Sequence, residues 1–167
     1  YPGPPGMDSQ RTTRFLEEIL MDFLPDHGSC FVCGKSNPRS IGIAWQLMAG
    51  NQIFASFAFG DFQQGPPGFV HGGASAAVMD EAMGLAVFYS GCRVVTANLS
   101  IDYRKPIPLG QPMTIQAVMS GKTERRILAL GEILFPDGSV AVSAKGIYAE
   151  ANHFFDKVMD QFLEPQK

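Results

Sequence analysis

The chain has 167 residues, which suits a single domain that buries a core without help from disulfides or a structural metal. Its net charge of −3 argues against nucleic-acid binding, and its charged residues, 17% against a usual level of about 25%, predict surface hidden against another subunit. No apolar run reaches the roughly 18 residues of a membrane span and residues 1–6 lack the features of a signal peptide, so we expect a cytoplasmic protein.

The N-terminal half is expected to hold two helices and two strands. Residues 1–9 are expected to form a disordered leader, and residues 10–24 follow an amphipathic helical pattern that a proline then ends. Residues 43–48 and 52–59 are strand-like and flank a Gly-Asn dipeptide, which is typical of hairpin turns. Residues 73–89 lack proline and are apolar on every face, which predicts a buried helix.

The C-terminal half changes to a period of two, which is the pattern of strands. In residues 94–103 the alternation places Thr96 and Asp102 on one face and Leu99 and Tyr103 on the other. Three further strands and a closing helix are expected at residues 113–119, 127–135, 140–148 and 152–162.

These elements predict an α+β domain. A helix that is apolar all round must be wrapped by something, and the strands that follow it are what the chain provides. The expected architecture is one long antiparallel sheet curled around the helix at residues 73–89, with extra helices at both ends of the chain. Residues 10–167 would form this single domain.

The three cysteines are one C-x-x-C pair, Cys30 and Cys33, and a separate Cys92. A structural zinc site needs four ligands, and His27 with Cys92 would have to complete it, although nothing in the spacing requires that. Redox chemistry of the thioredoxin type would need the pair to open a helix, whereas turn residues follow it here. We therefore expect buried thiols that act as small apolar side chains, and no metal.

His71, Gly72 and Gly73 lie where a loop meets the N-terminus of the predicted helix. The first N–H groups of a helix lack partners, and together with the helix dipole they favour negative charge. Glycine lets a ligand approach this backbone closely, so the segment predicts an oxyanion hole for a carbonyl attacked by water. The alternative is a glycine-rich helix cap with His71 packed beside it.

Asp80 is a carboxylate in a helix whose apolar pattern predicts that it is buried. Because burying an unpaired charge is costly, such a group must be hydrogen-bonded, protonated or open to a pocket, which makes it a functional candidate. The alternative is a structural carboxylate bonded to a neighbouring loop. Glu81 points about 100° away around the helix and is expected to be paired or solvated.

Helix geometry separates the two candidate groups. Gly73 and Asp80 are seven residues apart, so they share a helix face but lie about 10 Å apart along the axis. A base and an oxyanion hole must both lie within about 3 Å of one reacting carbonyl and its water. One chain cannot satisfy both, whereas a two-fold dimer with antiparallel helices side by side would form two equivalent sites.

Four stretches of the sequence carry a family resemblance. They are residues 65–73 (GPPGFVHGG), 79–81 (MDE), 96–99 (TANL) and 103–108 (YRKPIP). Over residues 30–148 the chain resembles the acyl-CoA thioesterases of the hotdog fold, and most closely their phenylacetate-pathway type and the mammalian thioesterase superfamily members 4 and 5. The resemblance implies the hotdog fold and a homodimer or a dimer of dimers.

The resemblance also implies roles at the reacting thioester. Asp80 would be the general base or the nucleophile, and Thr96 would position the water or the acid. The N–H groups of Gly72 and Gly73 would polarise the carbonyl, with His71 shaping that loop.

The resemblance also implies six candidates for binding the substrate: Gln64, Asp102, Arg104, Lys105, Arg125 and Arg126. Of these, Asp102, Arg125 and Arg126 fall where relatives contact coenzyme A. Gln64 lies near a position where some members of the family place an asparagine, and Arg104 and Lys105 are placed to meet the phosphates of coenzyme A. The alternative for the four basic residues is an ordinary solvated hairpin end. No cofactor is implied, because coenzyme A is part of the substrate.

The function that the resemblance implies is hydrolysis of a fatty or aryl acyl-CoA to the free acid and CoA. Three alternatives stay open: a non-catalytic acyl-CoA or lipid-binding hotdog protein, a hotdog hydratase, and a zinc-bound interaction module built on Cys30 and Cys33. The presence of Asp80 and Thr96 counts against a pure binder, because binding needs no buried base. The lack of a second histidine near the central motifs counts against a hydratase.

Overall fold

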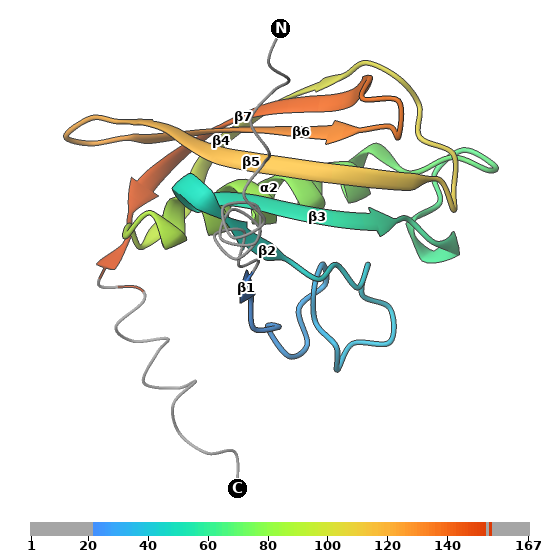
Figure 1. The fold of residues 1–167 in the computed structure, drawn as a ribbon, viewed down its shortest axis with the longest axis horizontal. Helices are drawn as coiled ribbons and strands as arrows, with labels where there is room; N and C mark the ends of the chain where they lie inside the picture. The colour runs from blue at the N-terminus through green and yellow to red at the C-terminus, as the bar shows by residue number, and fades with distance from the viewer. Residues whose placement is uncertain (1–21, 153, 155–167) are drawn as a thin grey trace, which may run out of the picture.

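The computed structural model describes residues 22–152 and residue 154, which form one antiparallel sheet wrapped around one long helix, α2 (Gly72–Tyr89) (Figure 1). The sheet has seven strands in the order β1-β2-β3-β5-β6-β7-β4, and every neighbouring pair is antiparallel. The strands are β1 (Asp22–Phe23), β2 (Gln46–Met48), β3 (Gln52–Ala58), β4 (Val94–Tyr103), β5 (Pro112–Lys122), β6 (Ile127–Leu134) and β7 (Val140–Glu150).

The α+β fold class with a central helix is confirmed, and α2 and β4 to β7 begin and end within two or three residues of their predicted bounds. The strand predicted at residues 43–48 is shorter than expected, because only Gln46–Met48 pair with β3. Between β2 and β3 the chain turns through Gly50 (φ 74°) and Asn51 (φ 58°). Both residues take the left-handed conformation that a tight hairpin turn needs, as the sequence predicted.

The prediction for the N-terminal helix was wrong at its end. Asp22 and Phe23 pair with β2 as a short strand, and Leu24 N–H donates to Trp45 C=O over 2.9 Å. Pro25 follows, and the residue before a proline is disfavoured in the helical conformation, so the chain is extended here. The predicted leader at residues 1–9, the rest of that helix and most of the closing helix at 152–162 lie outside the described residues.

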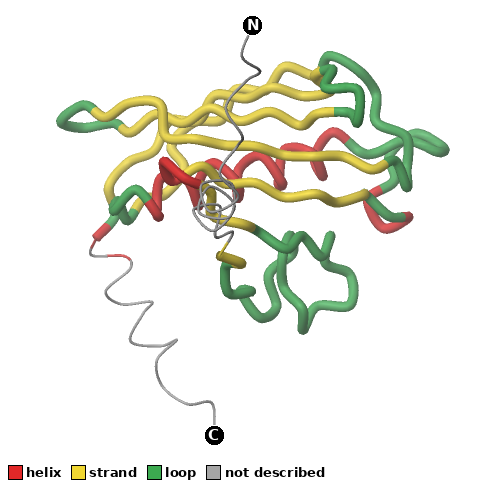
Figure 2. Tube along the Cα trace, viewed as in Figure 1, coloured by secondary structure: helices red, strands yellow, loops and turns green. Residues whose placement is uncertain are grey.

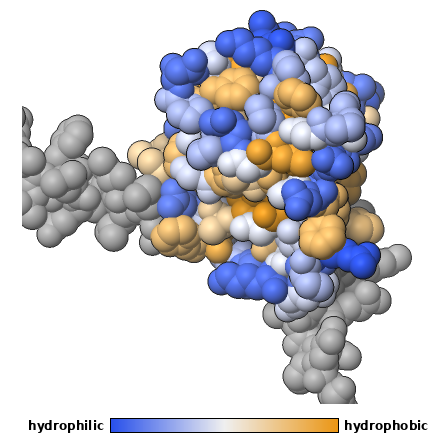
Figure 3. All heavy atoms as spheres, turned by 90° about the vertical axis from the view of Figure 1, so that its right-hand side faces the viewer, coloured by the Kyte–Doolittle hydropathy of each residue, from blue (hydrophilic) through white to orange (hydrophobic). Residues whose placement is uncertain are grey.

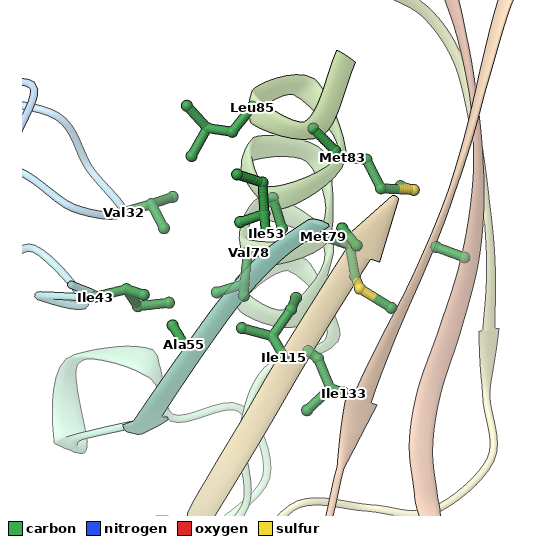
Figure 4. Packing of buried hydrophobic residues seen from close by; sticks show 14 of the residues in the cluster. Val32, Ile43, Ile53, Ala55, Val78, Met79, Met83, Leu85, Ile115 and Ile133 are labelled. Carbon is green, nitrogen blue, oxygen red and sulfur yellow. The ribbon is translucent and has the colours of Figure 1, made fainter. Parts of the chain in front are cut away.

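The core is built around α2 from two sides. Ile53, Ile115 and Ile133 of the sheet point at Val78 and Met79 of the helix (Figure 4). On the other side, the loop at residues 24–45, low in Figures 1 and 2, contributes further apolar side chains, of which Figure 4 shows Val32 and Ile43. Among the described residues no helix is long and apolar enough to cross a membrane.

A β-bulge in β4 overturns one prediction about side-chain direction. The pairing of β4 with β7 shifts by one residue between Thr96 and Asn98, so Ala97 is the extra residue. Because a bulge reverses the alternation, Thr96 turns toward α2 on the same side as Leu99 and Tyr103. The uninterrupted alternation read from the sequence had placed Thr96 on the opposite face.

Ile115→Ala should test this packing. Ile115 is fully buried against α2, so we expect its truncation to lower the free energy of unfolding by about 2–5 kcal/mol. The matched control is Val118→Ala on the same strand, because Val118 is 38% exposed and its loss should cost about 0.5 kcal/mol. Urea unfolding of both variants gives the comparison, and equal losses would contradict the assignment of the core.

Candidate active site

The loop before α2 is held in place by its own backbone and side chains. Val70 pairs with Gln64, and the side-chain oxygen of Gln64 accepts a hydrogen bond of 3.1 Å from Gly68 N–H. Gln64, predicted to meet substrate, therefore closes this loop. His71 N–H donates to Gln63 C=O over 2.8 Å, which fixes the residue from which the helix begins.

His71 is the N-cap of α2. Its backbone is extended (φ −67°, ψ 134°) and its Nδ1 accepts a 2.9 Å hydrogen bond from Gly73 N–H. A side chain at Gly73 would place a Cβ 3.0 Å from this Nδ1, so the close approach favours glycine. The helix-cap interpretation of His71 is therefore confirmed, while the oxyanion hole stays a prediction.

Of the two N–H groups expected to polarise a carbonyl, only one is free. Gly73 N–H is taken by His71, whereas Gly72 N–H has no hydrogen-bond partner within the part of the chain that the structure describes. The two N–H groups differ because the capping imidazole belongs to His71, directly before Gly72, and its Nδ1 bonds the N–H of Gly73 instead. Tyr103 Oη donates to Gly72 C=O over 3.0 Å and fixes this peptide from the end of β4.

A cleft of about 390 Å³ opens beside this helix end. Its lining residues come from the helix start, the end of β4 and the segment that follows: Pro66, Val70, Gly72, Ser75, Tyr103, Arg104, Lys105, Pro106, Ile107 and Val142. Two cations and a helix N-terminus at one opening favour an anionic ligand. Figure 3 faces this end of the molecule and shows apolar surface broken up by polar side chains.

Asp80 and Thr96 meet further along α2. Thr96 Oγ1 donates to Asp80 Oδ1 over 2.7 Å, while Oδ2 accepts no hydrogen bond from the described residues. The carboxylate is half-buried and opens onto a second cleft of about 390 Å³ with Gly84, Phe88 and Tyr148. Asp80 thus meets two of the expected conditions, a hydrogen bond and access to a pocket.

Tyr148 closes the inner side of this second cleft. Its Oη donates to Asp80 C=O at 3.5 Å. Burial, and then the charge of Asp80, raise the pKa of Tyr148 above its usual range, so its phenol stays protonated at neutral pH.

Glu81, the next residue of α2, faces away from Asp80 and is paired, as predicted. Trp45 Nε1–H donates to Glu81 Oε1 over 3.1 Å, and Cys30 and His27 also contact the carboxylate. Burial works against ionisation, but hydrogen bonds from His27, both nearby cysteines and Trp45 lower the pKa of Glu81. Glu81 is therefore ionised, and although it also lines the Asp80 cleft, its carboxylate is taken up by Trp45, Cys30 and His27.

The remaining predicted residues do not gather around one site within the chain. Asp102 lines a separate cleft of about 470 Å³ on the face of the sheet away from α2, and Arg104 Nε donates there to Ser143 Oγ over 3.2 Å. Arg125 and Arg126 lie in the β5–β6 turn, at the opposite end of β4 from Arg104. Ten residues of strand separate these ends by about 30 Å.

Two tyrosines at the clefts were missed as site residues. Tyr103 fixes the helix N-terminus and Tyr148 contacts the Asp80 peptide. The available signal was chemical, because a tyrosine in a strand of an apolar sheet needs a partner for its hydroxyl. Which partner it finds depends on the fold.

Comparison with known proteins supplies the family. A model of the thioesterase superfamily matches residues 67–133, which include α2, β4 and β5. Rat acyl-coenzyme A thioesterase THEM4 is 35% identical over 136 residues, covering 80% of this chain and 54% of the relative. Human acyl-coenzyme A thioesterase THEM5 is 34% identical over 89 residues, covering 53% of this chain and 36% of the relative.

A solved thioesterase superfamily protein shares the fold with a TM-score of 0.71 and 27% identity, covering 84% of this chain and 74% of that one. The chain is a relative of the hotdog-fold acyl-CoA thioesterases. It spans about half the length of the THEM4 relatives that it matches. The hotdog thioesterase fold expected from the sequence is confirmed, while the roles of individual residues stay predictions.

Exchange of His71 tests the cap of this hotdog helix. His71→Ala removes the acceptor for Gly73 N–H and should lower the free energy of unfolding by about 0.5–2 kcal/mol. His71→Asn should restore most of that loss, because asparagine is among the best N-cap residues. Chemical denaturation measures both variants, and equal destabilisation by alanine and asparagine would show that the cap is not what His71 contributes.

Proposed function

We propose that the protein is an acyl-CoA thioesterase, which hydrolyses a fatty or aryl acyl-CoA to the free acid and CoA. The observation that carries the proposal is the Asp80–Thr96 pair at the wall of a cleft, a carboxylate of which one oxygen has no hydrogen-bond partner among the described residues. The names of the THEM4 and THEM5 relatives support the same activity. A cytoplasmic location and the acyl chain preference stay predictions.

The proposed reaction uses two groups on one face of α2: Gly72 at the N-terminus of the helix and Asp80 further along it. Gly72 N–H, at the positive end of the helix dipole, stabilises the oxyanion that forms when the thioester carbonyl is attacked. Thr96 holds Asp80 by Oδ1, so that Oδ2 faces the reacting group. In one route Oδ2 takes a proton from the attacking water, the C–S bond breaks and the proton passes to the sulfur of the departing CoA. In the other, Oδ2 attacks the carbonyl itself, the C–S bond breaks to release CoA, and water then hydrolyses the acyl–Asp80 anhydride to the free acid.

The active site is proposed to be shared between two copies. Gly72 and Asp80 line separate clefts of one chain, and eight residues of helix place them about 12 Å apart along the axis. Two antiparallel α2 helices packed side by side bring the Gly72 end of one copy to the Asp80 cleft of the other. The same rotation brings the Arg125–Arg126 turn of the partner toward Arg104 and Lys105, where the phosphates of CoA would bind.

The surface around α2 supports such a dimer. β4 is the last strand of the sheet, so one of its edges is open for pairing. Phe88 and Val95 beside it are 47% and 40% exposed. Beyond its own helix backbone and chain neighbours, a Cβ at Gly84 would meet no atom of the described residues within 4 Å, although glycine inside a helix costs about 1 kcal/mol relative to alanine. A partner helix lying against Gly84 accounts for that glycine, and a dimer of dimers would use other surfaces.

Asp80→Asn tests the proposed chemistry. Since asparagine can neither accept the proton nor attack, we expect thiol release from a panel of short, long and aryl acyl-CoAs to fall roughly 100- to 10,000-fold. CoA binding should persist, and Asp61→Asn, an exposed carboxylate outside both clefts, should keep full activity. Wild-type binding of CoA without turnover would favour the non-catalytic binding protein, and turnover that survives in Asp80→Asn would exclude this mechanism.

Gly84→Leu tests the proposed interface. The larger side chain points to open space within the chain, so the fold should be retained, but it should push a partner helix away. We expect a monomer by light scattering and loss of thioesterase activity. Gly84→Ala is the control and should stay dimeric with a helix stabilised by about 1 kcal/mol. A fully active monomeric Gly84→Leu protein would refute the shared site.

A further inference from the structure

Four side chains with metal-binding atoms meet beside α2, at a residue that also lines the Asp80 cleft. His27, Cys30 and Cys33 come from the loop at residues 24–45, and Glu81 comes from the helix. One nitrogen, sulfur or oxygen atom of each lies within 4.8 Å of those of the other three. The third cysteine is elsewhere, since Cys92 Sγ lies 3.5 Å from Lys122 Nζ. The set therefore differs from the His27 and Cys92 combination considered from the sequence.

The spacing of these atoms resembles the edges of a coordination tetrahedron. Cys30 Sγ lies 3.2 Å from Glu81 Oε2, Cys33 Sγ lies 3.4 Å from His27 Nδ1, and that nitrogen lies 3.5 Å from Glu81 Oε1. Zinc bonds of about 2.0–2.3 Å at tetrahedral angles place neighbouring ligand atoms about 3.3–3.8 Å apart, and the remaining distances in this set are at most 4.8 Å. Small adjustments of side chains would centre an ion among all four groups.

Neighbouring residues hold the four side chains in place, by hydrogen bonds and by a tight turn of the backbone. Trp45, which is buried, donates its Nε1–H to Glu81 Oε1 and so orients the carboxylate. Val32 N–H donates to Cys30 Sγ over 3.3 Å, which fixes the position of the sulfur. A Cβ at Gly34 would clash with the backbone of Cys30, so glycine permits the tight turn that brings the two cysteines together.

We propose that His27, Cys30, Cys33 and Glu81 form a structural zinc site. Two thiolates, an imidazole and a carboxylate are the ligand types that zinc takes in proteins, and four protein ligands leave no open position for catalysis. Zinc binding would displace the thiol protons of the two cysteines, and the ion would offset two of the three negative charges that the thiolates and Glu81 then carry. It would tie the 24–45 loop to α2 at the residue next to Asp80, so its role is to position that helix.

Metal analysis of the full chain, purified with reductant and without chelator, tests this proposal directly. Wild type and Cys92→Ser should each hold one zinc per chain, whereas Cys33→Ser and Glu81→Gln should hold none after dialysis. Trp45→Phe should bind zinc roughly 10–100-fold more weakly, because it loses only the bond that orients Glu81. Removal of zinc from wild type should lower its melting temperature, and added zinc should restore it.

Cobalt substitution gives an answer even if a variant fails to fold. The metal-free wild type should bind one Co²⁺ and show a thiolate-to-cobalt charge-transfer band together with the strong visible bands of a tetrahedral site. Wild-type protein that holds no zinc and gives no such spectrum would overturn the proposal, as would zinc retained by Cys33→Ser or a Cys30–Cys33 disulfide in protein isolated without reductant. All these readouts are independent of thioesterase activity.

Discussion

The structure depends on covering one helix that is apolar on almost every side. A helix of this kind cannot face water, and α2 is covered by the sheet on one side and by the 24–45 loop on the other. What these two layers leave open is a narrow strip that carries Asp80 and Gly84 and ends at Phe88. The need to cover the apolar residues of α2 therefore decides which of its polar side chains reach the surface.

This constraint also gives the two adjacent carboxylates different surroundings. Successive residues of a helix point about 100° apart, so the carboxylates of Asp80 and Glu81 meet different partners although both residues line one cleft. Asp80 reaches the open strip and Thr96, whereas Glu81 reaches under the 24–45 loop to Trp45, His27 and Cys30. One side chain is left free to react with a ligand and its neighbour fastens the loop to the helix.

Most of the fold could be predicted because it follows from local patterns. The all-round apolar run identified α2, and period-two alternation identified β4 to β7. The bulge at Ala97 could not be predicted, because nothing in the alternation marks an extra residue. The predicted direction of the Thr96 side chain was therefore wrong. The short strand β1 was missed because its pairing is with β2, more than twenty residues away.

The sequence was enough to predict which residues belong to the candidate site, but not which contacts most of them make. His71, the two glycines and Asp80 stand out in the sequence, but only the structure shows that His71 occupies Gly73 N–H and leaves Gly72 N–H free. The cluster around Glu81 joins residues about fifty positions apart, a distance over which sequence spacing carries no information. The open edge of β4 and the bare surface at Gly84 likewise become visible only once the chain is folded.

Subunit complementation tests the shared site most directly. Gly72→Pro removes the free N–H at a helix position that accepts proline, and Asp80→Asn removes the base, so each variant alone should be inactive. When the two are refolded together, half of the dimers are mixed and each mixed dimer has one complete site, so activity should return to about one quarter of wild type. Mixed dimers that form and stay inactive would contradict a site built from Gly72 of one copy and Asp80 of the other.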